Sequence, residues 1–557
     1  MDRRSQIWLA GIVAVSLLLN LWGIDFGLPE RWHPDEITGR AIAMARELSL
    51  NPHEFRYGSL HFYQVLAVIV PTYLVGALLA LDHQASLLML AARALSALLG
   101  AGCVALTFLL ARRLFDTRTA VLSASFLALS PGLVSHAHFA TVDVPVMFWM
   151  TASFLMSAEV LRSGRRRAYV LAGLFAGLAA ATKYPGVTAL LCLPAAHLLA
   201  AGARDHRALL YGILAAGFAF LAANPPLFLA SCEFFEGIIR DNAYSSTQGE
   251  PRAIAAALAL NLRRALGGPL LILVCLSLIY AVALLSREQT RPKILLIAAM
   301  TVPTLLLLLG LNANYVRFVL PMLAPLTIIA GKATADLIAA RARYLRFAGA
   351  VAATVVIAVS ALYALAVDLE MTHDSRTLAV DWIERNVPQG ATIEVTSYVV
   401  APGDDRYRVT RRPHVHSAHL DTWIERLHDS PIYRILQPIY LAYQSFAEGI
   451  GICPRRPHHY RGWYDRVLTK QIGEGGTFDA SMAGLEARAP DLLVVSELYY
   501  SKHSRDQSSV EGRFFADLFA GRSSYRQVAA IEYQALPWLN PMVDFINPAI
   551  RIYQRAD

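Results

Sequence analysis

Two adjacent carboxylates, Asp35 and Glu36, follow the first long apolar segment and are the residues best suited to acid–base chemistry. A carboxylate that is ionised and held in place can accept a proton from a hydroxyl group as a general base. Apolar residues then recur at helical spacing, which predicts a short amphipathic helix in a membrane interface; they are Ile37, Ala41, Met44, Ala45 and Leu48. The alternative that Asp35 only caps this helix stays open.

Further polar residues stand at the ends of other apolar segments. They are His33, Arg56, Tyr57 and His61; His136, His138 and Asp143; Lys183 and Tyr184; and Asn312, Asn314, Tyr315 and Arg317. Charges at such positions are costly and often mark a site. For Lys183 or Arg317 alone, the simpler explanation is a side chain that extends to the lipid headgroups. Two carboxylates, one lysine and one arginine on the same predicted face together favour a site.

Metal and disulfide signals are weak. His136, His138 and Asp143 could ligate a metal, but two histidines and one aspartate are not specific. A second histidine group, His414, His416 and His419, is better explained as loop residues. The five cysteines form no Cys-x-x-Cys pair and no metal spacing, so no disulfide framework is predicted.

The composition is that of a polytopic α-helical membrane protein. Of 557 residues, 55% are hydrophobic, and the apolar residues come in long runs. Residues 1–367 hold 29 basic and 18 acidic residues, whereas residues 368–557 hold 21 and 24. The excess of basic residues thus lies in the membrane domain, as expected because the cytoplasmic loops of membrane proteins are rich in Lys and Arg. No basic patch with interleaved aromatic residues occurs, so nucleic acid is not a predicted partner.

Hydropathy predicts about eleven transmembrane helices together with interfacial helices. The predicted spans are 7–24, 87–111, 120–134, 144–161, 168–182, 185–201, 208–223, 269–285, 294–311, 318–338 and 347–367. Arg3 and Arg4 place the N-terminus inside. If 62–81 re-enters or lies on the outer surface, with Pro71 breaking its helix, all five basic connectors fall inside; these are 112–118, 162–167, 204–207, 287–293 and 341–346.

The chain divides into a membrane domain, 1–367, and a soluble α/β domain, 368–557. Helices are predicted over 377–386 and 513–520, and strands over 391–396, 491–496 and 525–531. This alternation is typical of an α/β domain. The segment 401–480 is rich in Arg, His and Pro and is not assigned.

Several motifs resemble the GT-C glycosyltransferases, in the branch of phospholipid carrier-dependent protein O-mannosyltransferases and aminoarabinose transferases. The matching stretches, in order, are HPDE at 33–36, RYGSLHFY at 56–63, TVDVP at 141–145, TKYPG at 182–186 and YVRF at 315–318. Their order along the first two-thirds of the chain is the specific part of the likeness. One departure is Gly58-Ser59, where the family has two prolines.

The resemblance implies a GT-C-like fold and inverting transfer of a sugar from a polyprenyl-phosphate donor to a hydroxyl acceptor. Asp35 would take the acceptor proton, Glu36 would support it, and Asp143 would orient the acceptor or share the base role. Lys183 and Arg317 would hold the leaving phosphate. The remaining substrate-binding residues would be His33, Arg56, Tyr57, His61, His138, Tyr184 and Tyr315. These residues require no cofactor, because the cations can supply the charge; the use of a divalent metal is left open.

Such an enzyme would lie in the bacterial inner membrane and glycosylate the cell envelope. Its site and C-terminal domain would face the periplasm, and the acceptor would be a protein, a lipid or a polysaccharide. A rival class is a transporter or a flippase for lipid-linked sugars, which places ionisable groups within the membrane. Here the spans are nearly free of charge, apart from Arg93, Lys332 and Asp336. A structural scaffold would not need the carboxylates and cations.

Overall fold

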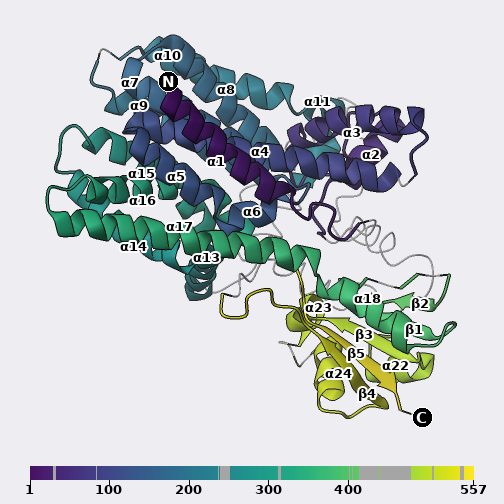
Figure 1. The fold of residues 1–557 in the computed structure, drawn as a ribbon. Helices are drawn as coiled ribbons and strands as arrows, with labels where there is room; N and C mark the ends of the chain where they lie inside the picture. The colour runs from purple at the N-terminus through teal and green to yellow at the C-terminus, as the bar shows by residue number, and fades with distance from the viewer. Residues whose placement is uncertain are drawn as a thin grey trace.

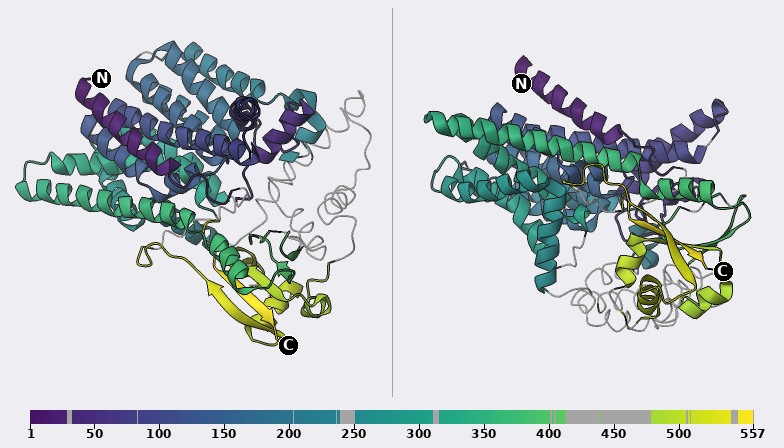
Figure 2. Two further views of the ribbon diagram at one scale, coloured as in Figure 1. Left: turned by 45° about the vertical axis from the view of Figure 1, so that its right-hand side comes forward. Right: turned by 60° about the horizontal axis from the view of Figure 1, so that its bottom comes forward.

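The structure is a computed structural model in which a bundle of long helices carries a smaller domain with a β-sheet at one end (Figure 1). The N-terminus lies at the opposite end of the bundle, and two further views show the same arrangement (Figure 2). The residues described are 1–28, 33–82, 84–202, 204–235, 237–238, 251–310, 315–400, 402–403, 405–412, 438, 478–504, 507, 509–539 and 545–556.

Apolar sequence runs form the helices of the bundle. They are α1 (Arg3–Leu21), α3 (Leu60–Leu78), α4 (Gln84–Leu114), α5 (Thr117–Ala128), α6 (Pro131–Ala137), α7 (Asp143–Ser163), α8 (Arg166–Thr182), α9 (Cys192–Leu199), α10 (His206–Ala222), α13 (Pro251–Leu266), α14 (Gly268–Leu284), α15 (Arg291–Gly310), α16 (Leu320–Ile338) and α17 (Arg343–Thr372). Shorter elements are α2 (Thr38–Glu47), α11 (Pro226–Leu229), and the 3₁₀ helices η1 (Tyr184–Leu191) and η2 (Val316–Phe318).

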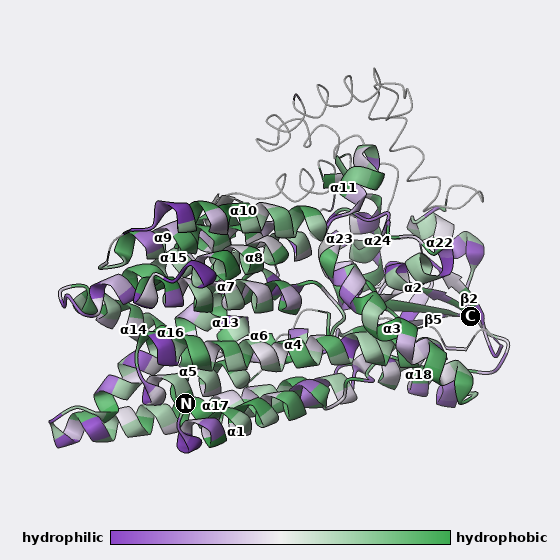
Figure 3. Cartoon of the chain, turned by 90° about the horizontal axis from the view of Figure 1, so that it is seen from above, coloured by the Kyte–Doolittle hydropathy of each residue, from purple (hydrophilic) through white to green (hydrophobic). Residues whose placement is uncertain are grey.

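The polytopic helical fold predicted from the sequence is confirmed. Among the described residues, seven helices are long and apolar enough to cross a membrane, or up to nine if two bent helix pairs each count as one span. This is fewer than the eleven predicted, although the seven include α3, which was not among those eleven; some predicted spans form shorter helices, such as α10 with 17 residues. Apolar residues, in green, recur along the bundle helices in Figure 3, and Ile272, Leu276, Ile279 and Val282 of α14 are exposed, as expected for a lipid-facing surface.

Two of the predicted continuous elements are broken. The predicted span 120–134 divides into α5 and α6, which meet at 57°, because Pro131 cannot continue the α5 hydrogen-bond ladder and begins a new helix instead. The predicted span 185–201 begins as η1, with Pro185 in its first turn, before α9 continues it. In α3, the residues after Pro71 are mostly exposed, including Leu74 and Leu78. The prediction that Pro71 breaks the helix of 62–81 is wrong, because α3 continues through Pro71 to Leu78, as apolar helices can when neighbouring groups satisfy the freed backbone. α3 is also one of the seven helices long and apolar enough to cross a membrane, so its failure to cross stays a prediction.

The C-terminal domain holds a five-stranded mixed sheet in the order β2-β1-β3-β5-β4. The strands are β1 (Thr392–Val395), β2 (Arg408–Arg411), β3 (Leu492–Ser496), β4 (Tyr525–Ile531) and β5 (Ile550–Arg555). β1 pairs in parallel with β2 and β3, whereas β5 is antiparallel to β3 and β4. The helices are α18 (Ser375–Asn386), α22 (Met482–Arg488), α23 (Glu497–His503) and α24 (Val510–Phe519).

The predicted α/β character of this domain is confirmed, and β1, β3, β4, α18 and α24 lie where the sequence placed strands and helices. The sequence did not predict β2 or β5. The proposed boundary at 367/368 stays a prediction; α17 continues to Thr372 before α18 begins.

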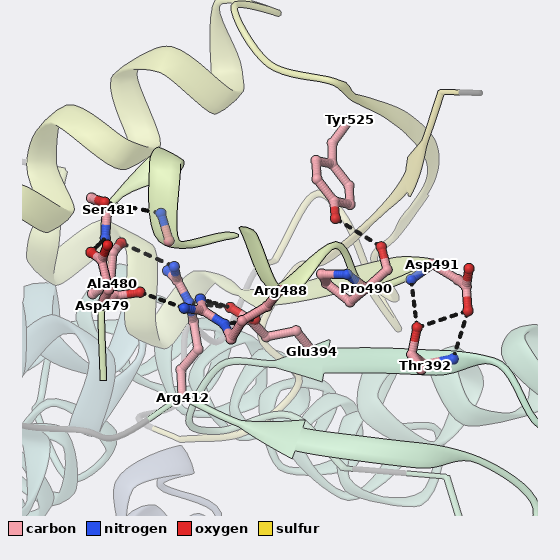
Figure 4. A network of polar contacts seen from close by, with 11 residues as sticks. Thr392, Glu394, Arg412, Asp479, Ala480, Ser481, Arg488, Pro490, Asp491 and Tyr525 are labelled. Carbon is pink, nitrogen blue, oxygen red and sulfur yellow. Dashed lines mark hydrogen bonds and ion pairs between the residues drawn. The ribbon is translucent and has the colours of Figure 1, made fainter. Parts of the chain in front are cut away.

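An ion network centred on the buried Glu394 connects β1, the end of β2 and α22 (Figure 4). Glu394 of β1 accepts hydrogen bonds from Arg412 Nε at 2.6 Å and from Arg488 Nε at 2.8 Å. Arg412 also donates to the Ala480 carbonyl, and its guanidinium lies 3.9 Å from the ring centre of Phe514. These contacts join β1, the end of β2 and α22, so they serve the packing of the domain.

The expectation of no disulfide is wrong at one position. Cys232 is disulfide-bonded, whereas Cys103, Cys192 and Cys275 carry free thiols. A disulfide follows from spatial proximity and from an oxidising compartment, neither of which cysteine spacing reveals.

Candidate functional site

Asp35 lies in the loop between α1 and α2, and arginines from two distant parts of the chain meet it there. Its Oδ2 is 2.7 Å from Arg317 Nη1, and its Oδ1 accepts a hydrogen bond from Arg56 Nη1 at 3.0 Å. The backbone N–H of Asp35 donates to His33 Nδ1 at 3.2 Å. Because α2 begins only at Thr38, with no side-chain cap, Asp35 does not cap the helix.

Asp143 and Lys183 form the second carboxylate–cation pair. Asp143 is the first residue of α7, and Lys183 follows the last residue of α8, so two neighbouring helices bring them together. Lys183 Nζ donates to Asp143 Oδ1 at 2.6 Å. The other oxygen, Asp143 Oδ2, is buried and has no hydrogen-bond partner among the described residues. A buried carboxylate oxygen that no protein group donates to is suited to accept a hydrogen bond from a ligand.

The ring of Phe318 brings the two pairs into one site. Lys183 Nζ lies 4.8 Å from its centre, and the Arg317 guanidinium lies 5.5 Å from it. Tyr57 contributes a second ring, 5.8 Å from Lys183 Nζ. A Cβ atom at Gly58 would stand 2.0 Å from the Ala181 carbonyl oxygen, so only glycine lets this loop lie against the end of α8.

The electrostatics keep the Asp35 pair charged. Burial alone would raise the pKa of Asp35, but the guanidinium groups of Arg317 and Arg56 outweigh it and hold that pKa below its ordinary value. Burial alone would lower the pKa of Arg317, but the Asp35 carboxylate raises it instead. Burial lowers the pKa of His33 to about 3, so this ring is neutral at physiological pH.

Glu36 does not face the same cations as Asp35. Arg93 of α4 binds it with two hydrogen bonds, Nε to Oε1 at 2.8 Å and Nη2 to Oε2 at 3.1 Å, and both side chains are fully buried. The backbone N–H of Ala140 also donates to Glu36. Arg93 donates in addition to the carbonyls of Ile24 and Phe26. Glu36 thereby anchors the loop that carries Asp35, and we propose that it supports the site through position.

Replacing Arg93 with leucine is expected to lower the free energy of unfolding by about 3–5 kcal/mol, because Glu36 would be left as a buried, unpaired charge. Thermal unfolding in detergent measures this loss. The matched control is Arg166→Leu, which breaks the Arg166–Asp205 pair of 2.8 Å at an exposed position; a surface pair contributes only about 0–1 kcal/mol. Equal unfolding temperatures for the two variants would contradict the anchoring role of Glu36.

Three of the other predicted site residues lie beside the two ion pairs, and a fourth lies behind them. Arg56, Tyr57 and Tyr315 lie at the paired carboxylates, with the Tyr315 ring centre 4.4 Å from the Arg317 guanidinium. Tyr184 lies behind the site, where its hydroxyl donates to the carbonyls of Phe55 and Tyr57.

Two predicted histidines point elsewhere. His61 Nδ1 pairs with Gln64, and the ring nitrogens of His138 lie 2.7 Å from the Val134 carbonyl and 2.9 Å from the Trp22 carbonyl. Their assignment as substrate-binding residues stays a prediction that these contacts do not favour.

The residues weighed as possible metal ligands do not form a metal site in the described part of the chain. No group of three or more His, Cys, Asp or Glu side chains in the described ranges could hold a metal ion. His136 is buried with its ring 6.0 Å from that of Phe139. Asn312, Asn314, His414, His416 and His419 lie outside the described residues.

Sequence reasoning did not assign two residues beside this site. In the sequence, Arg93 stands out only as a charge in an apolar span, although such a charge predicts a buried partner. Phe545 lies against His33 and Tyr315, with ring centroids 4.7 and 5.8 Å away. No local pattern distinguishes Phe545 in the sequence.

Residues 83–235 match the family described as dolichyl-phosphate-mannose-protein mannosyltransferase. No curated protein sequence matches the chain. The archaeal oligosaccharyltransferase AglB of Archaeoglobus fulgidus, in complex with an inhibitory peptide and a dolichol-phosphate, shares its fold with a TM-score of 0.51 at 12% identity, over 96% of this chain and 75% of that one.

Two more solved structures are similar at lower TM-scores. ArnT from Cupriavidus metallidurans bound to undecaprenyl phosphate has a TM-score of 0.48 at 14% identity, over 98% of both chains. The apo A. fulgidus oligosaccharyltransferase gives 0.45 at 13% identity, over 71% of this chain and only 63% of that one. Residues 83–235 thus match the dolichyl-phosphate-mannose-protein mannosyltransferase family, and the chain shares its fold with the archaeal oligosaccharyltransferase AglB.

Proposed function

We propose that this integral membrane protein transfers a sugar, with inversion, from a polyprenyl-phosphate donor to a hydroxyl acceptor on the outer face of the membrane. The observation that carries this proposal is the meeting of two carboxylate–cation pairs, Asp35–Arg317 and Asp143–Lys183, around the Phe318 ring. Glycosyl transfer to a hydroxyl needs a base for the acceptor and fixed positive charge for a departing phosphate. This site offers both.

The cations bind the donor phosphate and stabilise the charge that develops on it. Arg317 presents a planar fork that can bind two phosphate oxygens, whereas Lys183 acts as a point charge. In the structure each cation is paired with a carboxylate, so an arriving phosphate competes with Asp35 for Arg317 and with Asp143 for Lys183. Donor binding thereby releases the carboxylates for the acceptor.

The carboxylates handle the acceptor. The hydroxyl oxygen attacks the anomeric carbon, and its proton passes to an oxygen of Asp35 as that attack proceeds. The bond between the anomeric carbon and the phosphate oxygen breaks, and polyprenyl phosphate leaves with that oxygen. Asp143 Oδ2, which has no donor among the described residues, accepts a hydrogen bond from the acceptor and orients it. Attack from the face opposite the phosphate inverts the anomeric centre.

The similar proteins support a lipid-linked donor. The family is described by a dolichyl-phosphate-linked mannose, and solved relatives of the same fold hold dolichol-phosphate, undecaprenyl phosphate or an acceptor peptide. A polyprenyl phosphate must keep its tail in lipid while its phosphate reaches the membrane surface. The helix ends that carry Lys183 and Asp143 suit such a ligand.

The transport alternative has less support. A flippase needs ionisable groups along a path through the membrane. The buried charge of α4, Arg93, is bound to Glu36, and Lys332 of α16 is bound to Asp336 at 2.6 Å. These pairs serve packing rather than a path.

Deletion of the gene, followed by mass spectrometry of envelope glycans and lipids, tests the proposed function. A single missing sugar that returns with the parent gene is the expected result and identifies the sugar and the acceptor. An unchanged set of envelope glycans, with lipid-linked sugar redistributed between the two leaflets, would support a flippase instead.

Removal of divalent metal is expected to leave glycosyl transfer within about twofold of its original rate, because Lys183 and Arg317 supply the positive charge for the leaving group. The test is transfer before and after treatment with a chelator, with added zinc or magnesium as the control. Zinc is bound in one structure of the archaeal oligosaccharyltransferase. Loss of activity that a metal restores would contradict a metal-free site.

The site is expected to face the outside, because five basic connectors then lie inside. In a Cys275→Ser background, which removes the exposed free thiol, a cysteine at Asp491 should react with impermeant reagents added from outside. A cysteine at Arg165 should react only after the membrane is opened. The disulfide of Cys232 favours the same orientation, since oxidising compartments preserve such bonds. Labelling at 165 in intact cells would contradict this topology.

A further inference from the structure

We propose that Phe545, from the C-terminal domain, is a positioning residue. It keeps Arg317 and the loop that carries Asp35 in the positions that bind the donor phosphate. This inference rests on the proposed function. It adds a role for a domain in which sequence reasoning found no site residue.

Phe545 contacts both segments that supply the Asp35–Arg317 pair. Its ring is stacked on that of Tyr315, with centroids 5.8 Å apart and planes inclined by 23°, and it meets the His33 ring edge-on at 4.7 Å. Tyr315 lies 4.4 Å from the guanidinium of Arg317, and His33 accepts the backbone N–H of Asp35. One side chain therefore touches the immediate neighbours of both ion-pair partners.

The segment around Phe545 is itself held firmly to the end of the bundle. Arg376 Nη2 donates to the Phe545 carbonyl at 2.9 Å, and the backbone N–H of Asn547 donates to Asp374 Oδ2 at 2.7 Å. Asp374 and Arg376 are buried and ion-paired to each other at the junction of α17 and α18. Figure 1 shows this C-terminal segment, in yellow, passing beside α17 before it enters the sheet. These contacts fix the backbone at Phe545, so its ring can in turn fix the positions of Tyr315 and His33.

The backbone at Phe545 is strained. Its φ of 63° is in the left-handed region, where a large side chain is a rare outlier. Tyr398, whose ring is 6.1 Å from that of Phe545, has a φ of 66°. Strained residues of this kind persist where the surrounding structure determines them, and they concentrate at functional sites. The strain therefore supports a role of the ring in the site rather than in folding alone.

The test measures binding of undecaprenyl phosphate and glycosyl transfer by the full-length protein in nanodiscs. Phe545→Ala should weaken binding about threefold to tenfold, the range that one aromatic pair contributes, and should lower kcat as well. Phe545→Tyr keeps the ring and should bind like the parent. The matched control is Trp538→Ala, an aromatic of the same domain that is 70% exposed; it should change neither quantity.

A double-mutant cycle separates positioning from general destabilisation. If Phe545 acts through Tyr315, then Phe545→Ala combined with Tyr315→Ala should bind no more weakly than the worse single variant. Additive losses, or binding by Phe545→Ala equal to that of the parent, would overturn the positioning role. A parent protein that binds no undecaprenyl phosphate would overturn the proposed function and this role with it, whereas parental binding with no effect of Phe545→Ala would overturn the role alone.

Discussion

Asparagine in place of Asp35 is expected to lower the turnover of glycosyl transfer by roughly 10²-fold or more, because the variant keeps the shape of the side chain but cannot take the acceptor proton. Donor binding should not suffer. Asp35 holds Arg317 at 2.7 Å, so its loss frees that arginine for the phosphate. The expected signature is a reduced kcat with a donor affinity equal to or better than that of the parent.

Transfer kinetics and undecaprenyl-phosphate binding, measured side by side, check this result. Asp336→Asn is the matched control, because Asp336 also pairs with a cation, Lys332, but on α16 and away from the site. If Asp35→Asn retains kcat and loses donor affinity, then Asp35 only holds the two arginines. The base would then be Asp143, whose Oδ2 has no donor among the described residues.

Alanine in place of Arg317 is expected to reduce transfer by about 10²- to 10³-fold, the usual cost of removing one preorganised donor from a developing charge. Arg317→Lys should also be harmful, because lysine cannot bind two phosphate oxygens with one planar group. Lys183→Ala should weaken transfer and leave Asp143 as an unpaired buried carboxylate.

The competing explanation is that Lys183 and Arg317 only extend to the lipid headgroups, and it makes the opposite prediction for Arg317→Lys. A lysine would serve a headgroup as well as an arginine does. Arg166→Lys is the matched control, since this arginine pairs with Asp205 at the other end of α8 from Lys183. Transfer at the parental rate by Arg317→Lys would leave headgroup contact as the better account.

Chemistry-bearing residues could be predicted from the sequence because their types are rare beside apolar spans. Asp35, Asp143, Lys183 and Arg317 were predicted on one face, and the structure pairs them within 2.7 Å. Which carboxylate meets which cation could not be predicted, since the partners lie far apart in the chain. For the same reason, the pairing of Glu36 with Arg93 could not be predicted, since these residues are also far apart in the sequence.

Fold class and most strands of the C-terminal domain could be predicted, because hydropathy and alternation are local signals. β2 and β5 were not predicted, because their alternation of apolar and polar residues is short and the strands they pair with come from elsewhere in the chain. Leu48 was predicted as part of the apolar face of this interfacial helix, but it lies just beyond α2 as its left-handed C-terminal cap and is 94% exposed. Phe545 reaches the site only through tertiary packing.

Glycosyl transfer can be followed directly as the formation of polyprenyl phosphate by the purified protein, in nanodiscs that contain a polyprenyl-phosphate sugar and a hydroxyl acceptor. The parent should form polyprenyl phosphate in step with glycosylated acceptor, and Arg317→Ala and Lys183→Ala should form far less of both. Parental rates in both variants, or no polyprenyl phosphate from the parent with any such donor, would rule out glycosyl transfer at this site.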